Sequence, residues 1–247
     1  MTIRGQRELD AVREAGRVVS RILHALVRET RAGVTTGELD ATAARLLAEE
    51  SARSAPELVY GFPGATCISV NEEIVHGIPG PRTLRSGDVV KLDVTVEKDG
   101  FMADAARTVV IPVAGSEKKR LVACARTAFT EAMRVARVGF KVRDIGAAIE
   151  GVADRYGFSV VRDLNGHGIG RTIHEEPTVP GYYDPGRSES LIEGMVLAIE
   201  PILCTGSGNT RLRPDGWTVV TSDGSLAVHH ENTIVIRDGA PLVLTAA

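Results

Sequence analysis

The sequence predicts an α+β protein made of two similar halves, and three observations support this fold class. Apolar residues recur at helical spacing in two pairs of segments. Each pair is followed by β-branched stretches interrupted by Gly and Pro, which are typical of strands and tight turns. A short pattern ending in a carboxylate occurs once in each half. No linker-like composition separates the halves, so we expect a single domain over residues 1–247, with halves at about 1–115 and 116–247.

The first pair of helices is predicted before Pro56. The segment from Arg7 to Thr30 carries apolar residues three and four positions apart, which indicates one amphipathic helix. A second helix is expected from about Thr36, a good N-cap residue, through Leu47. After Pro56 the runs CISVNEEIVHGIPG, VVKLDVTV and FMADAARTVVIPV predict strands.

The second pair of helices is predicted at about Ser116 to Val138 and at Val142 to Tyr156. Gly139 and Gly157 are expected to cap their carboxyl ends, because glycine adopts the left-handed conformation at low cost. From residue 160 onward the pattern returns to strands and turns, with two dipeptides typical of hairpins: Asp223-Gly224 and Asp238-Gly239. The order of helices and strands in the first half is therefore repeated in the second.

The repeat is also visible residue by residue. The pattern Leu84-x-x-Gly87-x-Val89-x-x-Leu92-Asp93 matches Leu191-x-x-Gly194-x-Val196-x-x-Ile199-Glu200. Upstream, GVTTGELD at 33–40 loosely resembles GFKVRDIG at 139–146. We interpret these matches as a diverged internal duplication, which would bring Asp93 and Glu200 together near a pseudo-two-fold axis.

The composition excludes several classes of protein. Apolar content of 43% and charged content of 25% are ordinary for a globular protein, and a net charge of -3 argues against general binding of nucleic acid or anionic membranes. No apolar run approaches the roughly 20 residues of a membrane span, and the first residues lack a signal-peptide core. The three cysteines, Cys67, Cys124 and Cys204, form neither a disulfide framework nor a zinc spacing. A cytoplasmic protein is therefore expected.

Potential metal ligands stand in apolar, Gly-punctuated stretches at five positions: Asp93, Asp104, His167, Glu200 and Glu231. Carboxylates with a single imidazole form an oxygen-rich set that suits two hard or borderline divalent cations better than structural zinc. Such a pair of cations produces hydroxide from water near neutral pH. The ligand set therefore predicts a hydrolase.

Asp93 and Asp104 flank a predicted hairpin. Asp99-Gly100 favours a two-residue turn, which would place Thr95 opposite Asp104. The two aspartates would then share one face of the sheet as diagonal neighbours, roughly 7–8 Å apart at the backbone. A three-residue loop would instead send them to opposite faces, and two solvated strand aspartates are the alternative to a cation site.

The other three ligands lie in the second half. His167 stands between glycines in NGHGIG, and glycines let the backbone approach a ligand or metal closely; a surface-loop histidine is the alternative. Glu200 ends an apolar run and Glu231 lies between two of them. A buried carboxylate needs a partner, which is either an arginine or a shared metal cluster, and the whole set favours the cluster. His229 and His230 are interpreted as strand residues, with support of Glu231 as the alternative.

Several stretches together resemble the type I methionine aminopeptidases: SVNEEIVHGIP, KLDVTVEKDGFMADAART, NGHGIGRTIHEEP, AIEPIL and ENTIVI. They occur in that family's order and span nearly the whole chain. The resemblance implies the pita-bread (creatinase/aminopeptidase-like) fold, in which pseudo-two-fold halves surround a central antiparallel β-sheet with flanking helices. It also implies removal of the initiator methionine from nascent proteins and peptides, with a preference for a small second residue.

The resemblance implies a role for each metal ligand. Asp93 would chelate one divalent cation, Asp104 and Glu231 would bridge two, and His167 and Glu200 would complete the second site. Cobalt, manganese, iron and zinc all suit these ligands, so the sequence does not select among them.

The resemblance also implies catalytic and substrate-binding residues. Glu200 would take a proton from the attacking water, His76 would contact the substrate near the scissile amide, and His174 would hydrogen-bond the developing oxyanion. The methionine side chain would lie among Phe62, Cys67, Ile173 and Trp217. The expected partners are N-terminal Met peptides and nascent chains, without nucleic acid or a membrane, and the expected state is a monomer.

Three positions depart from the family's pattern. Val59 stands where a tyrosine is usual, Ile173 where an aromatic residue is common, and Asn232 where a histidine commonly follows the last ligand. These departures concern the shape of the pocket and the kinetics, because the ligand set itself is intact.

Two other functions are weighed as alternatives. A prolidase-like or aminopeptidase P-like hydrolase has the same fold, but such relatives usually carry an extra N-terminal domain for which 247 residues leave no room. A non-catalytic pita-bread binding protein would be expected to lack metal ligands, and none of the five is missing here.

Overall fold

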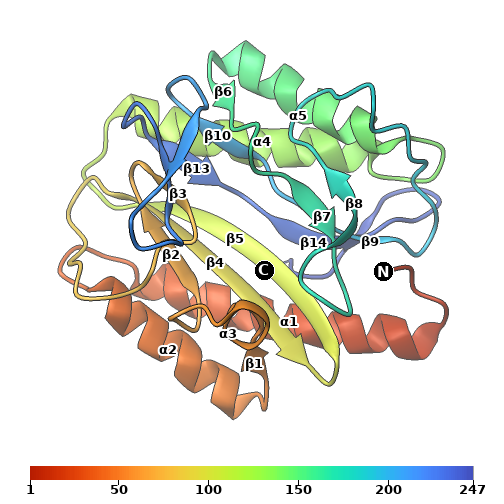
Figure 1. Cartoon of the computed structure of the whole chain (residues 1–247), viewed down its shortest axis with the longest axis horizontal. Helices are drawn as coiled ribbons and strands as arrows, with labels where there is room; N and C mark the ends of the chain where they lie inside the picture. The colour runs from red at the N-terminus through yellow and green to blue at the C-terminus, as the bar shows by residue number, and fades with distance from the viewer. Residues whose placement is uncertain (247) are drawn as a thin grey trace.

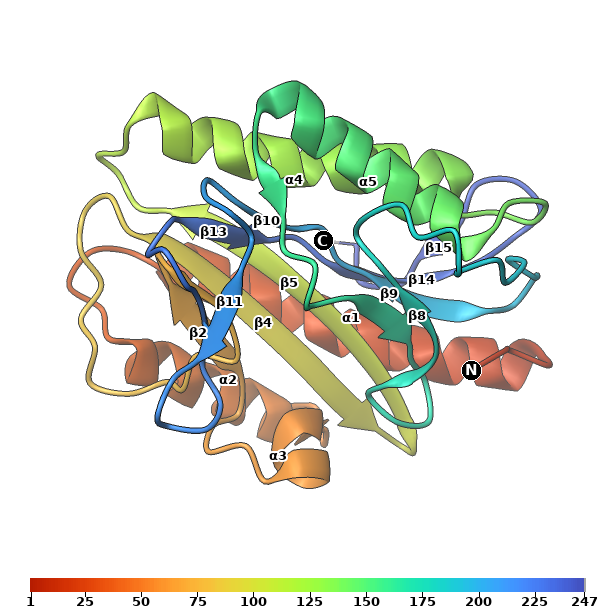
Figure 2. The same ribbon diagram turned by 45° about the horizontal axis from the view of Figure 1, so that its top comes forward.

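Two pairs of helices cover opposite sides of the β-sheets in the computed structural model, which describes residues 1–246 (Figure 1 and Figure 2). The first pair, α1 (Gln6–Glu29) and α2 (Thr36–Glu49), packs on the sheet of the first half. The second pair, α4 (Ser116–Val135) and α5 (Val142–Tyr156), packs on strands of the second half. The predicted repetition of paired helices followed by strands is confirmed.

The ends of α2 and α5 are fixed by their caps. α2 is capped by Thr35, one residue before the predicted position: its hydroxyl accepts a hydrogen bond from the Glu38 N–H (3.1 Å), and the Glu38 carboxylate accepts one from the Thr35 N–H (2.7 Å). This reciprocal arrangement satisfies two amide donors that the first helical turn leaves free. Gly157, with φ 73°, caps α5 as predicted.

The end of α4 differs from the prediction. The helix stops at Val135, and Gly139, with φ 94°, lies in the following loop instead of capping it. The Val138 N–H donates to the carbonyl of Arg237 (3.1 Å), so this stretch of backbone is bonded to the C-terminal part of the chain and not to the preceding helical turn.

A short helix beside the first sheet was not predicted. α3 (Ala55–Tyr60) begins after Ser54, whose hydroxyl accepts from the Glu57 N–H (3.3 Å). Pro56 lies in the first turn of α3, where the backbone N–H that proline lacks would have no helical partner. The residues directly after Pro56 are therefore helical, although the sequence pattern predicted strands after it. Leu58, Val59 and Tyr60 are exposed on it.

The sheet of the first half is built around one long hairpin. Its strands are, in spatial order, β1 (Arg53–Ser54), β4 (Val89–Lys98) and β2 (Cys67–Val70), with β5 (Phe101–Val110) also paired to β4. Asp99 (φ 52°) and Gly100 (φ 82°) form the two-residue turn, and Thr95 lies opposite Asp104, so the predicted register is confirmed. Asp93 and Asp104 therefore share one face of the sheet.

The main sheet of the second half is antiparallel. Its strands are, in spatial order, β15 (Leu242–Val243), β14 (Asn232–Val235), β9 (Val196–Ile199), β7 (Gly166–Gly168) and β8 (Glu175–Val179). The predicted hairpin at Asp238-Gly239 is confirmed, because β14 and β15 pair on either side of it. In Figures 1 and 2 this sheet lies beside the β4–β5 hairpin.

Two small sheets complete the fold. One contains β13 (Ala227–His229), β10 (Ile202–Cys204) and β6 (Ser159–Val160); the other contains β11 (Thr210–Leu212), β12 (Val219–Thr221) and β3 (Glu73–Val75). The predicted hairpin at Asp223-Gly224 is therefore wrong: the dipeptide does form a turn, but it joins β12 to β13, which belong to different sheets. A turn dipeptide fixes the local backbone and not the partner of each strand.

The internal repeat has a counterpart in the backbone. Each half contains one isolated β-bridge at the equivalent place, Thr35–Thr83 in the first half and Lys141–Ser190 in the second. Each half also contains the same backbone hydrogen bond: the Gly87 N–H donates to the Ile111 carbonyl, and the Gly194 N–H donates to the Ile236 carbonyl. Gly87 (φ 87°) and Gly194 (φ 82°) take the same left-handed conformation before β4 and β9.

Among residues 1–246, no helix is long and apolar enough to cross a membrane.

Candidate metal centre and substrate cavity

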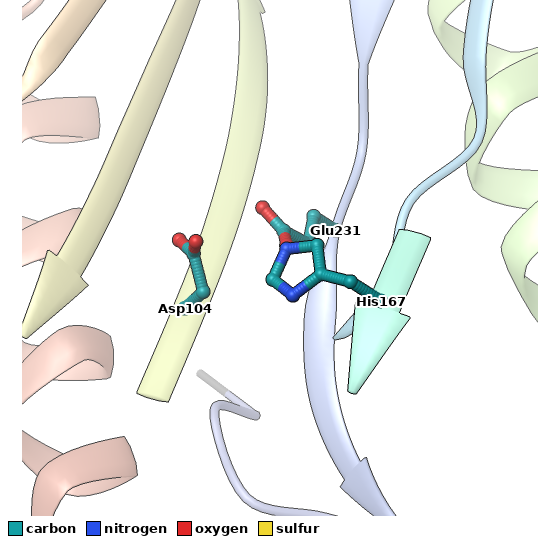
Figure 3. A group of neighbouring side chains, drawn as sticks. All are labelled: Asp104, His167 and Glu231. Carbon is teal, nitrogen blue, oxygen red and sulfur yellow. The ribbon is translucent and has the colours of Figure 1, made fainter. Parts of the chain in front are cut away.

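Three side chains from different segments converge between the halves (Figure 3). Asp104 lies on β5, His167 on β7, and Glu231 in the short link before β14. One ligand atom of each lies within 4.8 Å of the other two, and all three residues are buried. The structure thus brings together predicted ligands that are far apart in the sequence.

Two threonine hydroxyls join the halves beside this cluster. The Thr233 hydroxyl accepts from the Asp104 N–H (2.8 Å) and donates to the Asp104 carbonyl (2.9 Å). The Thr108 hydroxyl accepts from the His229 N–H (3.0 Å) and donates to the His229 carbonyl (2.7 Å). β5 therefore runs alongside the segment that carries Glu231, and the ligands of the two halves are held by direct backbone anchors.

His167 is oriented by its own strand. Its Nδ1 lies 2.9 Å from the carbonyl oxygen of Gly168, which leaves Nε2 to face the carboxylates. The flanking glycines were predicted to allow close approach to a ligand, but the close approach is to neighbouring strands. A Cβ at Gly166 would collide with the Ala198 carbonyl, and one at Gly168 with the Glu176 carbonyl.

Glu200 stands between two imidazoles. Its Oε1 lies 3.6 Å from Nε2 of His167, and its Oε2 lies 3.1 Å from Nε2 of His229. Nε2 of His229 is also 3.6 Å from Oε2 of Glu231, so Glu200, His229 and Glu231 form a second group with ligand atoms within 4.8 Å. The sequence pattern favoured a plain strand role for His229; the structure puts it in the cluster.

Asp93 adjoins the cluster from β4. It lies opposite Cys67 of β2 on one side and Ala106 of β5 on the other. Burial, followed by the charges of Asp104 and Glu200, raises its pKa well above the ordinary value. Asp93 is therefore electrostatically part of the same group of carboxylates.

The cluster carries an excess of buried negative charge. Burial and then the charge of Asp104 raise the pKa of Glu231, and burial raises that of Glu200 to about 8 although His167 opposes the shift. Oδ1 of Asp104 has no hydrogen-bond partner within residues 1–246. Buried carboxylates need compensating positive charge, and oxygen donors combined with imidazole suit divalent cations. These residues therefore fit a metal centre.

A small cavity of about 80 Å³ opens beside Asp93 and Asp104. Its remaining lining contains every residue expected to contact substrate, together with three others: Phe62, Cys67, His76, Ile173, His174 and Trp217, with Pro56, Tyr60 and Thr95. The rings of Phe62 and Trp217 meet edge to face, with centroids 5.3 Å apart. An apolar wall and two carboxylates thus share one cavity.

The two predicted non-ligand histidines line this cavity. Burial and then the neighbouring His229 lower the pKa of His76, whose backbone takes a left-handed φ of 56°. His174 is exposed at the rim, and its ring meets that of His167 edge to face with centroids 4.3 Å apart. Desolvation and then His167 lower the pKa of His174. Its Nδ1 lies 2.6 Å from the hydroxyl of Tyr60, a residue that no sequence motif indicated.

The three departures from the family pattern have different surroundings. Val59 is 38% exposed on α3, whereas Ile173 is 3% exposed and forms part of the cavity wall. The amide oxygen of Asn232 accepts from Arg107 Nη2 (2.7 Å), and Arg107 Nη1 donates to the Glu231 carbonyl (2.6 Å). Asn232 therefore helps to hold the backbone of the last predicted ligand.

Comparison with known proteins gives a family for residues 10–238 and a fold for the whole chain. Residues 10–238 match the metallopeptidase family M24. A methionine aminopeptidase of Clostridium perfringens is 41% identical over 243 residues, which cover 98% of each chain. The crystal structure of a methionine aminopeptidase from Thermotoga maritima covers 100% of both chains with a TM-score of 0.96 and 33% identity. A prolidase from Pyrococcus horikoshii has a TM-score of 0.80 at 21% identity, and the match spans 64% of that longer chain.

Proposed function

The chain belongs to metallopeptidase family M24 and, within it, to the methionine aminopeptidases, and from this premise we propose that it removes the initiator methionine from nascent proteins whose second residue is small. The observation that carries the proposal is the shared cavity. Two predicted metal ligands, Asp93 and Asp104, line it together with the residues expected to hold a methionine side chain. A site that holds both the side chain and the reacting bond favours cleavage next to that side chain.

The proposed ligand set divides between two divalent cations. Asp104, His167, Glu200 and Glu231 would hold one cation, and Asp93 would hold the other together with Asp104 and Glu231. The proximity of these donors and the raised pKa values of Asp93, Glu200 and Glu231 support this assignment. When bound, the cations supply an acidified water and an electrophile for the scissile carbonyl.

The residues of the chain then divide the remaining work. Glu200 takes the proton of the attacking water and passes it to the leaving amine. His174 donates a hydrogen bond to the carbonyl oxygen as negative charge develops, and His76 contacts the substrate beside the scissile amide. Asp93, on the cavity side of the cluster, lies toward the free amino group of the substrate, which accounts for cleavage from the N-terminus only.

The apolar wall selects the side chain. The wall of the cavity is apolar or aromatic and leaves little free volume, which suits one unbranched thioether side chain; its residues are Phe62, Cys67, Ile173 and Trp217.

We further infer that residues 1–247 act as one catalytic domain. We expect a cytoplasmic monomer that binds nascent chains and neither nucleic acid nor a membrane. Light scattering at micromolar concentration tests the monomer.

Hydrolysis of Met-Ala-Ser beside an X-Pro dipeptide, with and without added Mn(II) or Co(II), tests the function. We expect metal-dependent release of methionine from Met-Ala-Ser and no cleavage of the X-Pro bond. The matched variant Glu200→Gln keeps the size of the side chain and removes the base, so its turnover should fall at least about a hundredfold. Preference for the X-Pro dipeptide would indicate a prolidase, and no hydrolysis of either substrate would indicate a binding protein.

A further inference from the structure

His229 occupies in the second half the place that Asp104 occupies in the first. The equivalence follows from strand register, because β4 pairs with β5 as β9 pairs with β14, and the matching pairs are Leu92–Arg107 and Ile199–Asn232. Asp104 lies three positions before Arg107, and His229 lies three positions before Asn232. A proposed ligand of one half therefore has a histidine as its counterpart in the other.

The backbone anchors around the two residues repeat this equivalence. Thr233 bonds both the N–H and the carbonyl of Asp104, and Thr108 bonds both backbone groups of His229. Thr108 and Thr233 are themselves counterparts by the same register, because Thr108 follows Arg107 and Thr233 follows Asn232. Asp104 and His229 are therefore presented to the space between the halves by the same local construction.

The surroundings of the His229 ring resemble those of a ligand. The residue is 2% exposed, and neither ring nitrogen has a hydrogen-bond partner among residues 1–246. Nε2 lies 3.1 Å from Oε2 of Glu200 and 3.6 Å from Oε2 of Glu231. Two donors that share a cation at about 2.0–2.2 Å each lie roughly 2.8–3.6 Å apart for octahedral to tetrahedral angles, so these separations suit a common ion.

A plain hydrogen bond explains this geometry less well. The Nε2 of His229 is within reach of Glu200, yet no N–H···O bond of acceptable angle forms with either carboxylate. A buried imidazole with both nitrogens unpaired costs stability unless something else engages it. We propose that His229 is a further metal ligand, which adds a second imidazole to the cation held by Glu200 and Glu231.

This inference rests on the proposed metal-dependent function, and it changes which divalent cations the metal centre should prefer. A second imidazole favours borderline cations such as Co(II) and Zn(II) over Mn(II), which prefers carboxylate and water. Replacing His229 should therefore weaken Co(II) binding more than Mn(II) binding. Loss of a supporting contact to a metal ligand typically lowers affinity 10–100-fold, so loss of a ligand should lower Co(II) affinity at least about a hundredfold.

The first test counts imidazoles in the unaltered protein. In proton NMR of the Co(II)-loaded enzyme, each coordinated imidazole gives a strongly shifted, solvent-exchangeable N–H resonance. We expect two such resonances, one from His167 and one from His229. The count needs no variant, so it does not depend on whether a substituted protein folds.

The second test uses three variants and isothermal titration with Co(II) and with Mn(II). His229→Ala and His229→Gln should each lose one shifted resonance and at least about a hundredfold in Co(II) affinity. The matched control is His230→Gln, because that neighbouring ring packs against Phe129 with centroids 5.2 Å apart and lies outside both ligand groups. It should keep both resonances and the full affinity.

Other outcomes would overturn the inference in distinguishable ways. A single shifted resonance in an enzyme that cleaves Met-Ala-Ser would remove His229 from the ligand set and leave the proposed function standing. So would full Co(II) affinity in His229→Gln with a loss only in His229→Ala, because an amide can replace a hydrogen-bond donor but not this ligand. Absence of both cation binding and turnover in the unaltered chain would overturn the inference together with the proposed function.

Discussion

Tyr60 and His174 meet across the rim of the cavity, with the tyrosine hydroxyl 2.6 Å from Nδ1 of the imidazole. Tyr60 comes from α3 in the first half, and His174 precedes β8 in the second. A bond donated by the phenol keeps the imidazole proton on Nε2, the nitrogen left to face a substrate carbonyl. The contact thus links the two halves at the point where the oxyanion is proposed to form.

Replacement of Tyr60 by phenylalanine should lower kcat with little change in KM. The ring remains, so packing is kept, while His174 loses the bond that selects its tautomer; a net hydrogen bond of this kind corresponds to about fivefold to tenfold in rate. Steady-state kinetics on Met-Ala-Ser measure the effect. Tyr183→Phe is the control, because Tyr183 is 49% exposed and does not line the cavity. An unchanged kcat in Tyr60→Phe would show that the bond has no catalytic role.

Stability of the metal-free protein should fall as the pH rises from about 6.5 to about 8. In the folded chain the pKa of Glu200 is raised from 4.5 to about 8, and those of Asp93 and Glu231 are raised in the same direction. Below about pH 6.5 the histidines whose pKa values are lowered from 6.5 oppose this effect; above it they are neutral in both the folded and the unfolded state. Between about pH 6.5 and 8 the folded state therefore binds more protons than the unfolded state, so each rise in pH weakens folding. Calorimetry in EDTA measures the decline in Tm. Co(II) should reverse it, and a Tm that rises with pH in EDTA would contradict the charge assignment.

Replacement of Glu231 by alanine should abolish turnover with little loss of fold. The residue is proposed to bridge both cations, so titration calorimetry should show that both sites are weakened. In EDTA above pH 7 the more conservative Glu231→Gln should be at least as stable as the parent, because it removes one of several crowded buried carboxylates. Measurable peptidase activity in Glu231→Ala would rule out the bridging role.

Trp217 is the one tryptophan of the chain, so its fluorescence reports on the cavity directly. Added methionine should shift its emission in the metal-loaded protein, and isoleucine, which is β-branched, should not. Trp217→Ala should raise KM for Met-Ala-Ser about tenfold with a smaller change in kcat, because it removes part of the apolar wall used mainly in binding. An unchanged emission spectrum at saturating methionine would place the side-chain pocket elsewhere.

The sequence predicted most of the features whose causes are local. Asp99-Gly100 fixed a two-residue turn, and that turn placed Thr95 opposite Asp104 and put Asp93 on the same face. Glycine also marked the end of α5 correctly. The resemblance to the methionine aminopeptidases and the fold that it implies follow from the ordered motifs, and the comparisons bear them out.

The features that were missed depend on contacts between distant segments. Asp223-Gly224 forms a turn without a hairpin, because the two flanking strands pair elsewhere: β12 with β11 and β3, and β13 with β10. His229 could have been found by extending the repeat, but the spacing between counterparts is not constant. Leu92 and Ile199 are 107 positions apart, whereas Arg107 and Asn232 are 125 apart, since β10 to β13 are inserted between β9 and β14. A comparison at one fixed offset therefore loses the match before it reaches His229.

The paired anchors of Thr108 and Thr233 bear on how such a site could have arisen. If each half descends from one copy of a shorter chain, two copies meeting at this seam would have formed a symmetric cluster between identical subunits. Fusion of the copies freed each position to diverge, so that an aspartate at 104 could face a histidine at 229. Separately produced fragments that split the chain between the halves should therefore regain metal binding only on mixing, since neither carries a complete centre.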